Sequence, residues 1–432
     1  MKLPALKLFL FSFLFALLLV PELQKNISVF TFMPLSGEFV PEVKKPFTKE
    51  GWFDGTFQNS YDRHYEENIG FRNPLIRVYN QLDFSLFNVA HGGDIVVGKE
   101  GFLFQTQYLT AHAGMDFIGE KEIDARMERI KFVNTQLRKK GIHLIVAFAP
   151  TKADFFSEYV PAFYSRKDTA QTNYDLYRKK LSESEISFID FNDYFLKLKR
   201  TSPYPLFPKQ GIHWSQYGVY LAVDSLRKYI REKANIDLND IYCDSVQSSY
   251  ELKSTDYDLG DLTNVMDNMP HYEMPYPVLR FENNPTKPRP NLLTIGDSFY
   301  WNIYNAGIAK NLFNGSHFWY YNHDVYADSL PQKEVVNLVT FMNVVEKQQV
   351  VLILQTESNL NNIGLGFFES TSDILKGKEN QSPVLKVEEA IRNNPEWMEL
   401  IKRKAAEKNI SIDAMIRADA EWSVEQERLK KK

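Results

Sequence analysis

One serine and one histidine in this sequence have the local surroundings that nucleophilic catalysis requires. The segment LLTIGDSFYWNIY places Ser298 after an apolar run and before a predicted helix over residues 299–312. Free backbone N–H groups at a helix start, including that of Phe299, can stabilise a developing oxyanion. A serine hydroxyl is a weak nucleophile until a base accepts its proton, and His213 in LFPKQGIHWSQYG is the best candidate base. These residues together indicate acyl transfer or ester hydrolysis.

Each of these residues also has a purely structural interpretation. Asp297 or Ser298 would be an ordinary cap for the helix that follows. His213 precedes a predicted helix whose N-cap is Ser215, and a histidine beside Trp214 is often a packing residue. Only the combination of the two segments favours catalysis.

The elements that must position Ser298 and His213 form an alternating pattern. A helix with one apolar face, from Ile123 to Leu137, precedes the first of a series of apolar strands. Strands are predicted at 143–150, 186–191, 291–295, 315–322 and 350–354. Alternating strands and helices predict an α/β fold with a doubly wound parallel sheet. Ser298 would then lie at the carboxyl end of a strand, where such sheets gather functional groups.

The chain divides into four segments by composition. Residues 1–25 are a signal peptide or membrane anchor, and residues 26–90 form a lead-in with several prolines. Residues 91–380 hold the α/β pattern, beginning with a predicted β-hairpin at 93–104 and interrupted by a polar insertion at 236–288. Residues 381–432 are a charged helical tail.

The N-terminal segment predicts export. Lys2 and Lys7 precede an apolar run from Leu8 to Val20, which has the length of a signal-peptide core and is short for a membrane span. Pro21 and the residues after it do not form a small-residue cleavage site, so an uncleaved anchor is expected. A buried helix is the alternative, but the run is apolar on every face. The protein is therefore expected to be periplasmic or otherwise extracytoplasmic, anchored in the inner membrane.

Composition excludes several other classes of function. The 51 basic and 55 acidic residues nearly cancel and form no basic stripe, so nucleic acid is not an expected partner. A single cysteine, Cys243, rules out an internal disulfide. The eight histidines are scattered without metal-ligand spacing, and nothing indicates a metal or another cofactor.

The motif G-x-H-W-S-x-x-G at 211–218, followed downstream by a strand and GDSF, resembles the alginate O-acetyltransferase family of the AlgJ and AlgX type. These proteins are circularly permuted relatives of the SGNH/GDSL esterases, with the histidine motif before the serine motif. Further similar blocks are GDIVVGKEGFLF, AFAPTKADFFSEYVP and LGDLTNVM, at 93–104, 147–161 and 259–266. The resemblance covers roughly residues 50 to 370.

The resemblance implies that Ser298 is the nucleophile and His213 the general base. It also implies O-acetylation of a cell-envelope or secreted polysaccharide, with acetyl groups supplied by a multipass membrane acyltransferase of the MBOAT type. The family pattern is D-x-H-W, and Gly211 stands where the triad aspartate would be. Three alternatives remain: a dyad suffices, another carboxylate such as Asp190 or Asp193 orients His213, or activity is lost. In the last case the protein would be a weakly catalytic polysaccharide-binding or assembly component.

Further residues are weaker candidates for the site. In SGNH relatives an asparagine after a later strand donates to the oxyanion, which Asn359 or Asn322 would do here, although turn capping is the simpler interpretation of each. Three aromatic residues are candidates for facing a sugar, with core packing as the alternative: Trp214, Trp301 and Tyr304.

Overall fold

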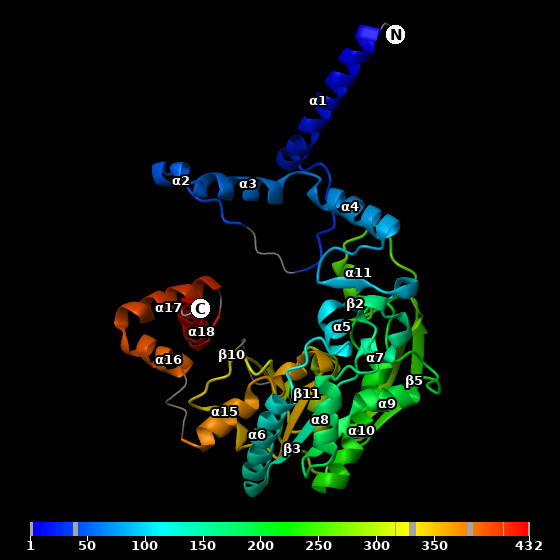
Figure 1. The fold of residues 1–432 in the computed structure, drawn as a ribbon, viewed down its shortest axis with the longest axis vertical. Helices are drawn as coiled ribbons and strands as arrows, with labels where there is room; N and C mark the ends of the chain where they lie inside the picture. Colours follow the sequence, from blue (N-terminus) through cyan, green and yellow to red (C-terminus); the bar gives the residue numbers. More distant parts are fainter. Residues whose placement is uncertain are drawn as a thin grey trace. The chain divides into compact units, whose positions relative to one another are not determined.

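The structure is a computed structural model that describes residues 3–37, 42–315, 317–327, 334–377, 383–408 and 410–430 (Figure 1). The chain forms two compact units. The first, here called the N-terminal unit, comprises Met1–Thr106, Lys209–Ile212 and Tyr257–His271. The second, here called the sheet unit, comprises Gln107–Pro208, His213–Asp256 and Tyr272–Lys432.

Among its described residues, the sheet unit is built on a seven-stranded sheet of order β10-β9-β8-β7-β11-β3-β4. The five strands β3, β4, β7, β8 and β11 pair in parallel, and each lies in one of the apolar runs identified in the sequence. Strands β9 and β10 continue the sheet beyond β8 as an antiparallel edge. The predicted doubly wound α/β sheet is confirmed, with this edge as an addition. The strands are β3 His143–Phe148, β4 Ser187–Asp190, β7 Leu292–Gly296, β8 His317–Tyr320, β9 Asp324–Ala327, β10 Glu334–Val335 and β11 Val350–Gln355.

Helices connect these strands and cover the sheet. They are α5 Thr106–His112, α6 Glu120–Lys139, α7 Lys152–Phe155, α8 Asn173–Ser182, α9 Phe191–Leu198, α10 Gln216–Ala234, α12 Tyr300–Asn305, α13 Ile308–Leu312, α14 Phe341–Val345 and α15 Phe367–Leu375, with short 3-10 turns at Ser157–Tyr159, Ala162–Tyr164 and Glu357–Asn362.

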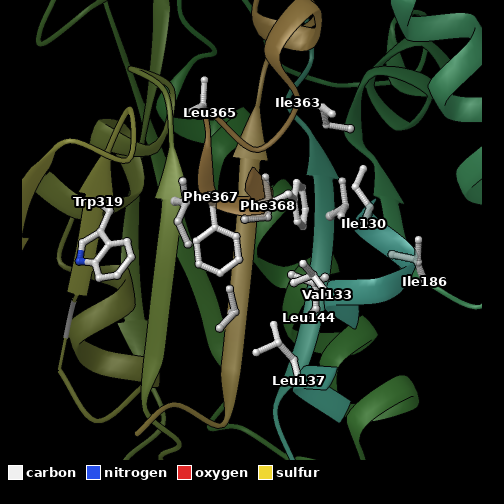
Figure 2. Close-up of a cluster of buried hydrophobic side chains, with 14 of the residues drawn as sticks. Ile130, Val133, Leu137, Leu144, Ile186, Trp319, Ile363, Leu365, Phe367 and Phe368 are labelled. Atoms are coloured by element: carbon white, nitrogen blue, oxygen red, sulfur yellow. The ribbon is translucent and has the colours of Figure 1, made fainter. Parts of the chain in front are cut away.

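One face of the sheet carries a large buried apolar cluster (Figure 2). The apolar face predicted for the helix preceding β3 is confirmed, because Ile130, Val133 and Leu137 of α6 all lie in this cluster, as does Leu144 of β3. Alternate residues of β3, β7 and β11 point to the same side, which is the period-two pattern of a strand. The burial of this face fixes the register of the central strands.

The helix predicted over residues 299–312 is two helices. Helix α12 ends at Asn305, and α13 begins at Ile308. Gly307 between them has φ of 66°, a left-handed conformation that glycine adopts without steric cost and that ends a helix.

The polar insertion at 236–288 contains two strands that were not predicted. Strands β5 (Ile241–Ser249) and β6 (Met274–Phe281) pair as an antiparallel ribbon in the sheet unit. Pro275 and Pro277 lie within β6, and proline lowers the strand signal of a sequence.

The N-terminal unit begins with α1 (Leu3–Ile27), of which Leu6–Ile27 is long and apolar enough to cross a membrane. Lys2 lies outside the described residues. The helices that follow are α2 Lys49–Phe53, α3 Thr56–Asn68, α4 Arg72–Phe87 and α11 Asp258–Leu262. The predicted hairpin is confirmed: β1 (Ile95–Val97) and β2 (Leu103–Gln105) are antiparallel and flank a 3-10 turn at Lys99–Gly101.

The charged C-terminal segment is helical, as predicted. It forms α16 (Pro383–Asn393), α17 (Pro395–Lys408) and α18 (Ile412–Lys430). These helices share a small apolar cluster of their own, made of Ile391, Ile401, Ala405, Met415, Ile416 and Ala420.

Candidate active site

Ser298 lies just beyond the carboxyl end of β7, in a tight turn against the neighbouring strand. A Cβ atom at Gly296 would be 2.9 Å from the backbone oxygen of Leu354 in β11, so any side chain at position 296 would push the turn away from β11. Asp297 and Phe299 are buried, whereas Ser298 is half-buried. The turn therefore leaves Ser298 partly accessible to solvent, while the residues on either side of it are buried.

The side chains of His213 and Ser298 meet, although 85 positions separate them in the chain. Nε2 of His213 is 3.0 Å from Oγ of Ser298, which is within hydrogen-bond distance. The imidazole ring also packs on the ring of Phe299, with 4.8 Å between centroids. His213 was expected to be the base for Ser298, and a base has to lie this close to the hydroxyl, so the arrangement suits proton transfer from the hydroxyl to the ring.

The loop that carries His213 is anchored by the residues that follow it. Ser215 is the N-cap of α10, as predicted, and its hydroxyl accepts a hydrogen bond from the Gly218 N–H at 3.1 Å. The same hydroxyl donates to the carbonyl of Pro205 at 2.8 Å. His213 therefore lies two residues before a helix start that these hydrogen bonds hold in place, which restricts the positions that its ring can take.

Asp297 holds the serine turn in place, a role that the sequence analysis considered only as helix capping. Its carboxylate is almost fully buried and accepts hydrogen bonds from the Phe299 N–H at 3.1 Å and the Asn359 amide at 2.9 Å. It also accepts from both the backbone N–H and the hydroxyl of Thr356, at 2.7 and 2.8 Å. Four donors from two chain segments thus compensate the buried charge.

The candidate oxyanion donors differ in the groups that they contact. The Phe299 N–H points to Asp297, so in this state it does not point to an oxyanion, contrary to expectation. The Asn359 amide lies beside the serine turn but also donates to Asp297. Asn322 lies in a turn after β8 with φ of 54°, and its side-chain oxygen is buried without a hydrogen-bond partner among the described residues. The Ser298 N–H and the two asparagine amides remain the candidate donors.

Two tyrosines that the sequence analysis missed lie near Asp297. Burial, followed by the negative charge of Asp297, raises the pKa of both Tyr108 and Tyr321. Both side chains therefore stay neutral phenols at physiological pH and keep their O–H donors. Tyr108 belongs to α5 and Tyr321 follows β8, so no local motif connects them with GDSF.

The aromatic candidates separate into a buried residue and a partly accessible pair. Trp214 is fully buried and packs on Phe299 with 5.7 Å between ring centroids, so the expectation that it faces a sugar is wrong. Trp301 and Tyr304 are half-buried, and their rings are 5.4 Å apart. They belong to a cluster of rings completed by Phe318, Tyr320 and Tyr326.

The structure does not bring the suggested carboxylates to His213. Asp190 caps α9, accepts a hydrogen bond from the Tyr174 hydroxyl at 2.8 Å and pairs with Arg178 at 2.7 Å. Asp193 pairs with Arg178 as well. Strand β4, which ends at Asp190, is three strand positions from β7, or about 14 Å at the usual strand spacing. Both carboxylates belong to the capping and ion pairing of α9.

A second buried polar cluster follows the ends of β3 and β11. Nδ1 of His112 is 2.5 Å from Asp154, whose other carboxylate oxygen accepts from Asn192 at 2.6 Å. Burial and the nearby charge of Asp154 raise the pKa of Glu357 well above its usual range. Within the described part of the chain, no group of three or more His, Cys, Asp or Glu side chains is arranged to hold a metal ion.

Comparison with known families identifies the fold of this region. Residues 95–296 match a family model described as the SGNH hydrolase-like domain of the acetyltransferase AlgX. The match contains His213 and ends two residues before Ser298. The predicted resemblance and the SGNH hydrolase-like fold are therefore confirmed.

Individual relatives show the same similarity at low identity. The chain is 24% identical over 187 residues to the probable alginate O-acetylase AlgJ of Pseudomonas aeruginosa, covering 43% of this chain and 45% of that one. It is 21% identical over 181 residues to the protein of the same description from Azotobacter vinelandii, covering 41% and 44%. The chain thus spans less than half the length of these relatives.

Similar solved structures include the O-acetyltransferase domain of Pseudomonas putida AlgJ, with 15% identity and a TM-score of 0.41 over 63% of this chain and 93% of that one. Another is Bacillus cereus PatB1, with 13% identity and a TM-score of 0.39 over 63% and 99%.

Proposed function

We propose that this protein is an O-acetyltransferase that modifies a polysaccharide through Ser298 and His213. The observation that carries the proposal is the 3.0 Å contact between Nε2 of His213 and Oγ of Ser298 at the carboxyl end of β7. The match to an SGNH hydrolase-like acetyltransferase domain supports acyl chemistry at this position. The relatives described as probable alginate O-acetylases support a polysaccharide as the acceptor.

The reaction would proceed in two half-reactions. In the first, Oγ of Ser298 bonds to the acetyl carbonyl carbon while its proton passes to Nε2 of His213, and the donor group leaves with that proton. In the second, a sugar hydroxyl gives its proton to His213 and its oxygen bonds to the carbonyl carbon of the acetyl-serine. The bond from that carbon to Oγ of Ser298 then breaks, and Oγ takes the proton back from His213. The Ser298 N–H and the amide of Asn359 or Asn322 would hold the oxyanion in both steps.

The N-terminal helix supports a location outside the cytoplasm. Helix α1 would keep Lys7 towards the cytoplasmic side of the inner membrane and place the sheet unit in the periplasm. Acetyl donors are made in the cytoplasm, so an acetyl group has to cross the membrane before it reaches Ser298. A multipass MBOAT-type acyltransferase is the partner that we propose for this step.

A second candidate function is polysaccharide binding or assembly with little catalysis. Gly211 favours it, because this residue cannot supply the carboxylate found in the D-x-H-W pattern. The two functions differ in whether Ser298 becomes acetylated.

Incubation of the full chain with an activated acetyl ester tests the choice. We expect a burst of alcohol release and an acetyl adduct on Ser298 by mass spectrometry, both absent from Ser298→Ala. Ser165→Ala, at an exposed serine, is the matched control and should retain both. A wild-type chain that forms no adduct would favour the binding function.

A further inference from the structure

Helix α4 turns an apolar face to solvent. Five apolar side chains recur at helical spacing on this face, and 40% to 68% of each is exposed. They are here called the α4 stripe and are Leu75, Val78, Tyr79, Leu82 and Leu86. A stripe about 100° wide is the width that a helix normally turns towards an apolar environment.

The opposite face of α4 is bonded to the rest of the N-terminal unit, which fixes the orientation of the stripe. Nδ2 of Asn80, which is buried, donates to the carbonyl of Thr263 at 2.8 Å. The guanidinium of Arg77 donates to the carbonyls of Val265 and Pro34, at 3.1 and 2.9 Å. The polar side of the helix therefore faces protein and the apolar side faces outwards, the reverse of an ordinary surface helix.

The end of α1 packs on the segment that leads into α4. The Tyr65 hydroxyl of α3 donates to Glu22 at 3.1 Å, and the Lys25 ammonium lies 4.6 Å from the centre of the Tyr65 ring. A Cβ atom at Gly70 would be 2.1 Å from the Pro21 carbonyl, so the turn between α3 and α4 touches α1 directly. Helix α4 thus begins two residues after Gly70, which lies against Pro21 in the last two turns of the membrane-spanning candidate Leu6–Ile27.

We propose that the α4 stripe lies in the interface of the bilayer that holds α1. This inference rests on the proposed membrane anchoring and is independent of the proposed catalysis. The α4 stripe is exposed, and polar contacts on the other side of the helix keep it facing outwards. Because it adjoins the candidate membrane helix, lipid is its nearest apolar environment. Trp52 and Phe53 of α2, in the same unit, are also exposed, and aromatic residues are enriched at this depth of a membrane.

The test uses the full chain reconstituted in vesicles of phosphatidylethanolamine and phosphatidylglycerol. Because Cys243 is the only cysteine, Cys243→Ser gives a background for single labels. A fluorescent probe is attached at Leu82→Cys or Leu86→Cys. The control is Glu232→Cys, an exposed position on α10 in the sheet unit. Each sample is quenched with nitroxide-bearing lipid and separately with aqueous iodide.

The expected result is that probes at 82 and 86 lose emission to the lipid quencher and are protected from iodide, with the opposite pattern at 232. Iodide quenching at 82 and 86 equal to that at 232 would show that the stripe stays in water and would overturn the proposal. Protection from iodide without lipid quenching would mean that protein, such as a second copy, covers the stripe, which also overturns it. Failure of the chain to float with the vesicles would instead contradict the anchoring by α1.

Discussion

The carboxylate of Asp297 and the end of β11 are joined by Thr356, which donates to Asp297 through its backbone N–H at 2.7 Å and its hydroxyl at 2.8 Å. This double contact connects two segments separated by 59 positions. It ties the turn that carries Ser298 to the neighbouring strand, so the position of the serine depends on the buried carboxylate of Asp297.

Replacing Asp297 with asparagine should weaken this connection. Asparagine has an NH₂ group in place of one carboxylate oxygen, and this group cannot accept a hydrogen bond. At least one of the four hydrogen bonds is therefore lost, and the free energy of unfolding should fall by about 1–3 kcal/mol. Turnover of an acetyl ester should fall too, because Ser298 loses its fixed position. Chemical denaturation and ester kinetics measure the two effects. Asp168→Asn, at an exposed aspartate, is the control, and an Asp297→Asn protein as active as this control would contradict the positioning role.

Replacing Trp214 or Trp301 with alanine should have different consequences. Trp214 is fully buried, so Trp214→Ala should lower the free energy of unfolding by about 3–5 kcal/mol. Trp301 is half-buried in its ring cluster, and we expect Trp301→Ala to raise KM for a polysaccharide acceptor while leaving hydrolysis of a small ester nearly unchanged. Equal losses with the polymer and the small ester would indicate that Trp301 is a packing residue.

Introducing the family aspartate as Gly211→Asp tests whether this protein compensates for its absence. Gly211 is buried, so a carboxylate introduced there would have to fit in a place without free access to solvent. In a competent enzyme we therefore expect acetyl turnover to stay the same or to fall. Steady-state kinetics on an activated ester give the answer. A rise of several orders of magnitude, the size of a triad acid's contribution, would show that the natural protein lacks this acid and has no substitute.

The stability of the protein should depend on the protonation of Glu357. Its pKa is raised in the folded state by burial and by Asp154, from an ordinary value of 4.5. A raised pKa in the folded state means that the folded state binds the proton more tightly than the unfolded state does. The contribution of protonated Glu357 to the free energy of unfolding is therefore complete below pH 4.5 and is lost as pH rises through the folded pKa. Glu357→Gln keeps a neutral side chain at every pH.

We therefore expect the melting temperature of wild type to fall relative to Glu357→Gln as pH rises above 4.5. Thermal unfolding across a pH series measures the difference. Glu128→Gln, at an exposed glutamate, is the control and should show no such trend. Parallel profiles for wild type and Glu357→Gln would contradict the prediction.

Much of the fold could be predicted because its signals are local. The apolar runs that become β3, β4, β7, β8 and β11 are visible as continuous stretches, and the apolar face of α6 repeats every three or four residues. Ser215 was predicted as a cap because capping involves only the next few residues. The ribbon β5–β6 was missed, since prolines interrupt β6 and most residues of β5 are polar and at least partly exposed, which leaves no alternating apolar pattern.

For the site, the sequence by itself determined which residue types are present: a serine at a strand end, a histidine before a helix and no aspartate at position 211. Only the tertiary structure decided what each contacts. Strand order places β11 beside β7, which brings Thr356 and Asn359 to Asp297 and keeps Asp190 three strands away. Hydrogen bonds between strands and burial of side chains join segments that are distant in the chain, and such long-range pairing leaves no periodic signal within either segment.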